Sequence, residues 1–346
     1  MTAETARPPR TRRRAGRATM ADVAKLAGVS AITVSRLLRD PASVSDALAL
    51  RIREAVDRLG YVPNMMAGGL AAAKSRIVGV IVPSIRNAFF SSTVDTLAAE
   101  LGTRGLSVLD ASTNYDPERE DKLLETMLAW NPAGLVLTGF AHGPRAAAIL
   151  ARVDIPVVEM WDVAGRPFDM AVGFDHFAVG RRAGEHLVKR GCRRVAVLGA
   201  VLAKDTRAGA RCAGVRDALD RAGLEAVATL DLPRPSNVGD GAAAFAELLK
   251  RQGGIDGVAF SNDVLALGAL FECQRRGVRV PGDVALIGFG DLDFAAHSLP
   301  SLTTLRPPRE TIGRETARLL AERFDGLEPA SRMVDVGCEL IVRESA

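Results

Sequence analysis

The chain has 346 residues, of which 48% are hydrophobic and 25% are charged, as in an ordinary globular protein. It contains no run of about 18 apolar residues, and its arginine-rich start lacks the apolar segment of a signal peptide, so we expect no membrane partner. The net charge of +4 is uneven: residues 1–76 hold 14 Lys and Arg against 6 Asp and Glu, and the remainder holds 31 against 35. A basic head on a mildly acidic body predicts that only the head meets a polyanion.

The first 17 residues and the cysteines carry little local pattern. Residues 1–17 contain six arginines among Pro, Thr, Ala and Gly, so we expect a disordered basic arm. It either adds non-specific phosphate contacts or is a solvated tail. The four cysteines (Cys192, Cys212, Cys273 and Cys338) have neither zinc nor redox spacing. We interpret them as reduced core residues of a cytoplasmic protein and predict no metal and no cofactor.

Residues 19–38 predict two short helices joined by a turn. Thr19 and Ser30 suit the helix N-caps, and Gly28 stands where the chain must reverse. Val34 and Leu37 on the second helix face the first, which is the pattern of a helix-turn-helix. In this motif the second helix enters the major groove of DNA. The residues that we expect to contact DNA are Thr19, Ser30, Ala31, Ile32, Thr33, Ser35 and Arg36. The alternative is an ordinary helical hairpin with a solvated face.

A third helix is predicted from Ser45 to Leu59, with Gly60 as its stop. The segment 61–76 then reads YVPNMMAGGLAAAKSR. Tyr61-Val62-Pro63-Asn64, followed by Ala67 and Leu70 directly after such a headpiece, resembles the lac repressor family of transcription regulators. The resemblance implies a hinge helix that pairs in the minor groove, with Asn64, Ala67 and Leu70 at the DNA. Gly68 and Gly69 depart from the family's more usual polar pair and weaken this helix by about 1 kcal/mol each.

From Ile77 onward, short apolar runs alternate with helical stretches. Runs at 77–82, 106–111, 134–139, 156–160 and 170–174 predict buried parallel strands, and a second series follows at 195–200, 228–232, 257–260 and 284–289. Two series without a new linker predict an α/β body of two doubly wound parallel-sheet subdomains that face each other across a cleft. The resemblance implies the same body, like that of a periplasmic binding protein. The segment 338–345 resembles the family's closing strand without a heptad tail after it, which implies a homodimer.

These patterns divide the chain into four parts. We expect the arm at 1–17, a helix-turn-helix headpiece at 18–63, a hinge at 64–75 and a ligand-binding and dimerisation domain at 76–346. The last part is expected to contain one subdomain of roughly 76–174 plus 305–328 and another of 175–304 plus 329–346.

Loops after the strands of an open α/β sheet line its ligand crevice. The residues predicted there, from the loops and from the family resemblance, are Asn87, Phe89, Thr138, Glu159, Asp175, Arg207, Asp263 and Asp291. Carboxylates and amides suit a hydroxyl-rich ligand, and aromatic faces suit the C–H surface of a sugar. The alternative is that several of these residues are strand-end caps or salt-bridged surface residues.

Segments such as LAWNPAGLVLTG, IPVVEMWD and FECQRRGVRVPGDV resemble the gluconate-utilisation repressors of the family. The ligand class that this implies is a sugar acid, with Arg207 on its carboxylate. A neutral sugar or a purine is the alternative effector.

Two other functional classes fit less well. An enzyme is disfavoured because the four histidines are scattered and no nucleophile elbow, P-loop or dinucleotide fingerprint occurs. A sugar-binding transport receptor would share the body, but it would need export and would not carry a DNA-reading head. The sequence therefore predicts a regulator that binds double-stranded operator DNA under the control of a small-molecule effector.

Overall fold

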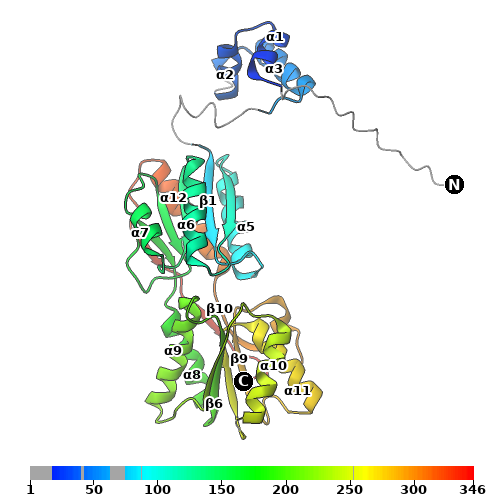
Figure 1. Ribbon diagram of the computed structural model, residues 1–346, viewed down its shortest axis with the longest axis vertical. Coiled ribbons are helices and arrows are strands. Elements are labelled where there is room, and N and C mark those ends of the chain that lie inside the picture. Colours follow the sequence, from blue (N-terminus) through cyan, green and yellow to red (C-terminus); the bar gives the residue numbers. More distant parts are fainter. Residues whose placement is uncertain (1–17, 40–42, 63–74, 87, 252) are drawn as a thin grey trace, which may run out of the picture. The chain divides into compact units, whose positions relative to one another are not determined.

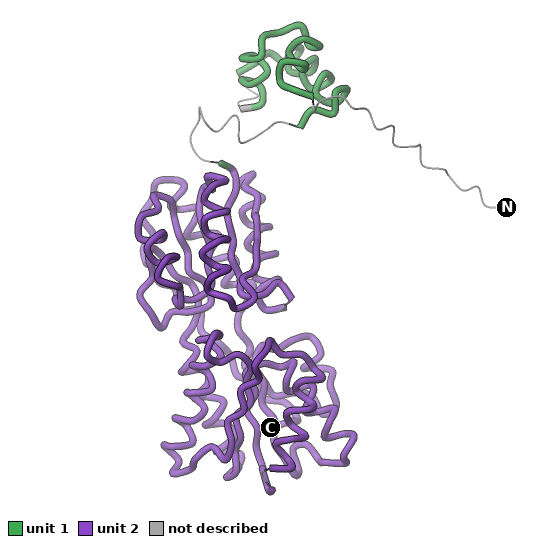
Figure 2. Tube along the Cα trace, in the orientation of Figure 1, with its two compact units in different colours: residues 1–75 green, residues 76–346 purple. Residues whose placement is uncertain are grey.

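The computed structural model describes residues 18–39, 43–62, 75–86, 88–251 and 253–346 (Figure 1). The chain divides into two compact units, residues 1–75 and 76–346, which are described separately (Figure 2). The predicted arm 1–17 and all but the last residue of the predicted hinge 64–75 lie outside the described residues. Within the described residues, no helix is both long and apolar enough to cross a membrane.

The first unit contains α1 (Met20–Ala27), α2 (Ala31–Arg39) and α3 (Asp46–Leu59). Thr19 caps α1 reciprocally with Asp22: the Thr19 hydroxyl accepts the Asp22 amide at 3.3 Å, and the Asp22 carboxylate accepts the Thr19 amide at 2.8 Å. Gly28 ends α1 with a φ of 65°, a left-handed conformation that glycine adopts without steric cost. The core that holds the helices together consists of Val23, Ala24, Ala27, Val34, Leu37, Ala49, Ile52, Ala55 and Tyr61.

The described part of the second unit holds two six-stranded sheets. The first has the order β11-β5-β4-β3-β1-β2 and is parallel throughout. Its strands are β1 (Ile77–Val82), β2 (Ser107–Ser112), β3 (Gly134–Thr138), β4 (Val157–Met160), β5 (Met170–Gly173) and β11 (Met333–Asp335). The second has the order β12-β10-β9-β8-β6-β7 and is parallel except for β12. Its strands are β6 (Val195–Ala200), β7 (Ala228–Leu232), β8 (Gly257–Phe260), β9 (Ala285–Phe289), β10 (Thr303–Arg306) and β12 (Glu339–Ile341).

Helices cover both faces of each sheet, which explains the continuous apolar runs of the central strands. In the first sheet, Val80 faces the core under α5 (Ala88–Gly102) and α12 (Arg309–Phe324), and Ile81 faces α6 (Pro117–Ala129) and α7 (Pro144–Leu150). In the second sheet, Val197 faces α8 (His176–Lys189) and α9 (Thr206–Arg221), and Leu198 faces α10 (Val238–Arg251) and α11 (Asp263–Arg276). The edge strand β2 was predicted to be buried, but it exposes Ser107, Leu109 and Asp110 because no strand covers its outer side.

The first subdomain is the first sheet with its helices, and the second subdomain is the second sheet with its helices. The chain passes from one subdomain to the other after β5, after β10 and after β11. β11 pairs with β5 in parallel, with Val334 opposite Val172, and only β12 returns to the second sheet. The predicted boundary, which gave all of 329–346 to the second subdomain, is therefore wrong. A strand of three residues is too short to show an alternating or apolar pattern, and β11 is recognisable only by its pairing.

The backbones of α8 and α9 touch because glycine stands on both helices. A Cβ at Gly180 would lie 2.0 Å from the Arg211 carbonyl oxygen, and one at Gly214 would lie 2.1 Å from the Phe177 carbonyl oxygen. Real Cβ atoms do not approach backbone so closely, so this crossing requires glycine. The contact fixes the register of Arg211 on α9 against His176 on α8.

We expect Gly180→Ala to lower the free energy of unfolding by about 1–3 kcal/mol, because the added methyl group forces two packed helices apart. Gly102→Ala is the matched control: Gly102 ends α5 with no atom within 4 Å of the added Cβ. It should be neutral or stabilising by up to about 1 kcal/mol. Urea unfolding of the full chain measures both, and equal losses would contradict the close crossing of α8 and α9.

Candidate functional site

A cleft opens at the carboxyl ends of the strands, between the two subdomains. Its empty space is about 470 Å³, with the open solvent at its mouth included. The segments that follow β1, β2 and β3 form one wall, and the segment that follows β6 forms the other. The polar side chains along it are Thr113, Tyr115, Asp116, Glu120, Thr138, Lys204, Thr206 and Arg207.

Arg207 is the cation that crosses this cleft. Its Nη1 donates to the Thr138 carbonyl oxygen at 3.1 Å, and its Nη2 lies 3.3 Å from Asp205 Oδ1. Because Arg207 lies in the first turn of α9 and Thr138 ends β3, the bond joins the two subdomains. Gly139 makes room for it: φ there is +73°, and a Cβ would lie 2.5 Å from Nη1.

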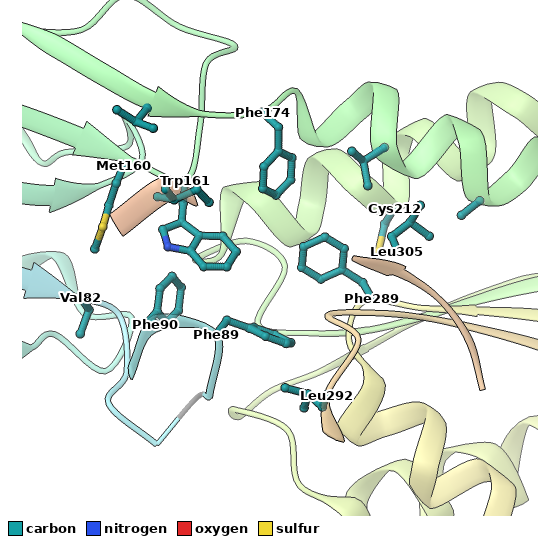
Figure 3. Packing of buried hydrophobic residues seen from close by; sticks show 14 of the residues in the cluster. Val82, Phe89, Phe90, Met160, Trp161, Phe174, Cys212, Phe289, Leu292 and Leu305 are labelled. Atoms are coloured by element: carbon teal, nitrogen blue, oxygen red, sulfur yellow. The ribbon is translucent and has the colours of Figure 1, made fainter. Parts of the chain in front are cut away.

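Aromatic side chains from both subdomains pack together beside the cleft (Figure 3). The ring centroid of Phe89, from α5, lies 5.7 Å from that of Phe289 in β9 and 6.3 Å from that of Trp161. Phe174 also contacts Phe289, at 6.2 Å. All four side chains are buried, so electrostatic interactions near this cluster are weakly screened by water.

A chain of buried polar groups continues from Trp161. His176 Nε2 lies 2.6 Å from the Trp161 carbonyl oxygen, to which it must donate, so its Nδ1 accepts from Arg211 Nη1 at 2.8 Å. Burial first, and then the positive charges of Arg211 and Arg207, hold the pKa of His176 well below its usual range, so the imidazole is neutral.

Arg211 adds a buried positive charge to the second subdomain. It donates to the Ser261 carbonyl oxygen at 2.9 Å, and its guanidinium carbon lies 3.7 Å from the ring centroid of Phe289. Within the described residues, the Nε of Arg211 and the Nε1 of Trp161 find no hydrogen-bond partner. A buried cation with an unused donor makes its surroundings favourable for an anion.

On the first subdomain, His142 lies between two carboxylates. Its Nδ1 is 2.9 Å from Glu120 Oε1 on α6, and its Nε2 is 3.1 Å from Glu159 Oε1 on β4. Glu159 Oε2 also accepts the Phe168 amide at 2.7 Å. Burial alone would lower the pKa of His142, but the hydrogen bonds and charges of both glutamates outweigh it and raise the pKa to about 9. The group is therefore a buried imidazolium with a carboxylate on each ring nitrogen.

The first unit presents a separate candidate site on α2. The Ser30 hydroxyl accepts the Thr33 amide at 3.2 Å and bonds the Thr33 hydroxyl at 2.9 Å, which caps the helix. Val34 and Leu37 are buried in the headpiece core, whereas Ile32 is 69% exposed and Arg36 is exposed. The outward face of α2 thus offers an apolar side chain and a cation, which suits the major groove.

Of the other residues predicted at DNA, Ala31 is exposed and Ser35 is half-buried. Thr19 is exposed, with its hydroxyl engaged in the cap of α1. Asn64, Ala67 and Leu70, and the ligand residue Asn87, lie outside the described residues.

Residues 19–64 match the family model of bacterial regulatory proteins of the lacI family, and residues 185–346 match that of a periplasmic binding protein-like domain. The chain is 43% identical over 334 residues to the HTH-type transcriptional regulator GntR of Pseudomonas aeruginosa, covering 96% of this chain and 97% of that protein. The chain belongs to the lacI family of bacterial regulatory proteins.

Solved structures agree with this membership. A LacI-family transcriptional regulator from Silicibacter pomeroyi is 33% identical with a TM-score of 0.90, covering 95% of this chain and 99% of that one. The lac repressor dimer bound to operator and the anti-inducer ONPF has the same fold, with 24% identity, a TM-score of 0.80 and the same coverage. The predicted fold class and the prediction of a DNA-binding transcriptional regulator are confirmed, and the relatives of this lacI-family protein are regulators rather than enzymes.

Of the predicted ligand residues that the structure describes in this lacI-family protein, Thr138 and Arg207 line the cleft, and Phe89 lies in the adjoining aromatic cluster. The other described carboxylates have partners within the protein. Asp175 caps α8 by accepting the Ala178 amide at 3.0 Å, and Asp291 pairs with Arg306 and Arg343. Glu159 is buried, and both of its carboxylate oxygens are engaged, one with His142 and the other with the Phe168 amide, so it is not open to a ligand.

Asp263 was predicted to line the ligand pocket, but it is fully buried. Its carboxylate accepts the Thr304 hydroxyl at 2.6 Å and the Leu292 amide at 3.0 Å. Burial raises its pKa to about 6 in spite of these hydrogen bonds. Asp263 holds the loop after β9 against β10. Its neighbour Asn262 is the N-cap of α11.

The polar lining residues that the sequence interpretation missed follow β2 or β6: Thr113, Tyr115, Asp116 and Glu120 after β2, and Lys204 and Thr206 after β6. The signal was available, because the loop after the second strand opens on the same edge as the loops after the first and third. Arg211 and His142 carried no signal, since their partners come from distant segments. Among the described residues, no cluster of three or more His, Cys, Asp or Glu could hold a metal ion.

Replacement of the buried imidazolium tests its charge. Because the pKa of His142 is raised from 6.5 to about 9 in the folded state, its contribution is complete below pH 6.5 and is lost as the pH rises towards 9. The stability advantage of the wild type over His142→Gln should therefore shrink by about 1–3 kcal/mol across that window. Urea unfolding of both proteins at several pH values measures it. A constant difference would mean that His142 is neutral in the folded protein.

Proposed function

We propose that this regulator acts in the cytoplasm as a homodimer on a near-palindromic operator, under the control of a sugar acid bound in the cleft. The observation that carries the effector class is the pair of cations, Lys204 and Arg207, on the wall that the second subdomain contributes. A guanidinium pairs with a carboxylate through two parallel hydrogen bonds, which a neutral sugar cannot offer. The resemblance to the gluconate-utilisation repressors supports the same class.

The remaining lining suits the rest of such a molecule. Hydroxyl groups of Thr113, Tyr115 and Thr206 lie along the cleft and can donate or accept hydrogen bonds to ligand hydroxyls. The buried guanidinium of Arg211 adds positive charge on the same subdomain without a direct place in the lining. A polyhydroxylated anion therefore fits both the charge and the hydrogen-bonding capacity of the cleft.

Regulation follows from the two-subdomain architecture. A ligand between the subdomains changes the angle at which they stand, and so alters how the two headpieces of a dimer meet a half-site each. A coupling free energy of about 1–3 kcal/mol is enough, and by linkage operator DNA must change effector affinity by the same factor. The lac repressor, which has this fold, is a dimer on its operator.

The exposed cation of α2 provides the test of DNA reading. Arg36→Ala should cost about 1–3 kcal/mol of operator binding and relax base choice at one half-site position. Arg53→Ala removes the same charge from an exposed position on α3 and should affect operator and random DNA equally. Fluorescence anisotropy with both DNAs gives the comparison. If Arg36→Ala also weakens both equally, Arg36 contacts only phosphate.

The effector class is tested by charge. The wild type should bind D-gluconate much more tightly than D-glucose. Arg207→Ala should cost about 3–5 kcal/mol of gluconate binding, because it removes one partner of a desolvated ion pair. Lys250→Ala, which removes a positive charge from an exposed position on α10, is the control. Calorimetric titration measures all three proteins. Preference for glucose, or for a purine, would overturn the sugar-acid proposal and leave the regulator intact.

A further inference from the structure

The charges that line the cleft are separated by subdomain. Among the described lining residues, the cations Lys204 and Arg207 both belong to the second subdomain, and the carboxylates Asp116 and Glu120 both belong to the first. A ligand that spans the cleft therefore meets a positive wall at one end and a negative wall at the other. A molecule with one carboxylate and a hydroxylated tail matches this polarity, because ionised carboxylates accept hydrogen bonds from hydroxyl groups.

Of these two carboxylates, Glu120 is the better placed to accept hydrogen bonds from ligand hydroxyl groups. Its Oε1 is fixed by His142 at 2.9 Å, and its side chain is only 12% exposed. It lies in the first turn of α6, where the helix dipole favours negative charge. Asp116, by contrast, is the cap of that helix and already accepts the Glu118 amide at 3.1 Å.

The imidazolium does not neutralise this wall. His142 carries one positive charge and contacts two carboxylates, those of Glu120 and Glu159. Both ring nitrogens contact a carboxylate oxygen, so the imidazolium donates one hydrogen bond to each carboxylate. One negative charge is left over, and Glu120 is the member of the group that reaches the cleft lining.

We propose that Glu120 is a specificity-determining residue. Its carboxylate accepts hydrogen bonds from the hydroxyl groups in the tail of a sugar monoacid and repels a second carboxylate at that end. This rests on the proposed sugar-acid function and refines it: the cleft accepts aldonates and rejects aldarates of the same length. Specificity of this kind comes from a repulsive element as much as from an attractive one.

The test compares two six-carbon acids that differ at one end, D-gluconate and D-glucarate, by calorimetric titration. The wild type should prefer gluconate by at least about tenfold, since the charge of Glu120, whose side chain is only 12% exposed, is weakly screened and repels a second carboxylate nearby. Glu120→Gln keeps an acceptor for His142 but removes the charge. It should improve glucarate binding by about tenfold and weaken gluconate binding, because a neutral amide oxygen accepts hydrogen bonds from the tail hydroxyl groups less strongly than a carboxylate does.

Glu118→Gln is the matched control, because Glu118 lies on the same turn of α6 but is exposed and does not line the cleft. It should behave like the wild type. A gain in glucarate affinity cannot result from misfolding, so the predicted improvement is diagnostic. Equal binding of the two acids by the wild type, or an unchanged ratio in Glu120→Gln, would overturn the role of Glu120 alone. Binding of neither acid would overturn the sugar-acid function together with it.

Discussion

The packing of Phe89 against Phe289 is the contact on which the arrangement of the second unit depends. The two rings come from different subdomains, so a single apolar core runs through both sheets instead of ending at each. Apolar packing of this kind is non-directional and tolerates sliding, which leaves the choice of angle between the subdomains to polar contacts. The Arg207 bond to the Thr138 carbonyl is such a contact, and the low dielectric of the aromatic cluster increases its strength.

Two buried histidines, one in each subdomain, differ in charge because their neighbours differ. Burial by itself acts to lower the pKa of both imidazoles. His176 faces Arg211 and stays neutral, so the positive charge on the second subdomain belongs to the arginines. His142 faces Glu120 and Glu159 and is charged, yet it leaves the first subdomain with an excess carboxylate. Neither imidazole therefore reverses the charge of the wall behind which it lies. The second subdomain keeps its positive charge, and the first keeps its negative charge.

The sequence predicted those parts of the molecule that depend on local pattern. The cap at Thr19, the reversal at Gly28 and the apolar run Ile77–Val82 each follow from residues close in the chain, and the structure contains all three. It failed where pairing is distant. β11 is a strand only because β5 lies beside it, and Asp263 is structural because Thr304 and Leu292 reach it from another loop. The sequence alone does not distinguish an aspartate that faces a ligand from one that accepts a hydrogen bond from a distant threonine.

The position of Arg207 also bears on the direction of regulation. Its Nη1 is already bonded to the Thr138 carbonyl, so a bound carboxylate must either share the guanidinium or displace that oxygen. An effector that leaves the bond in place stabilises the present angle between the subdomains, and one that displaces it releases them. A ligand shifts an equilibrium only by its differential affinity for the two states. The sign of control therefore depends on whether the bound effector keeps or displaces this one hydrogen bond between the subdomains.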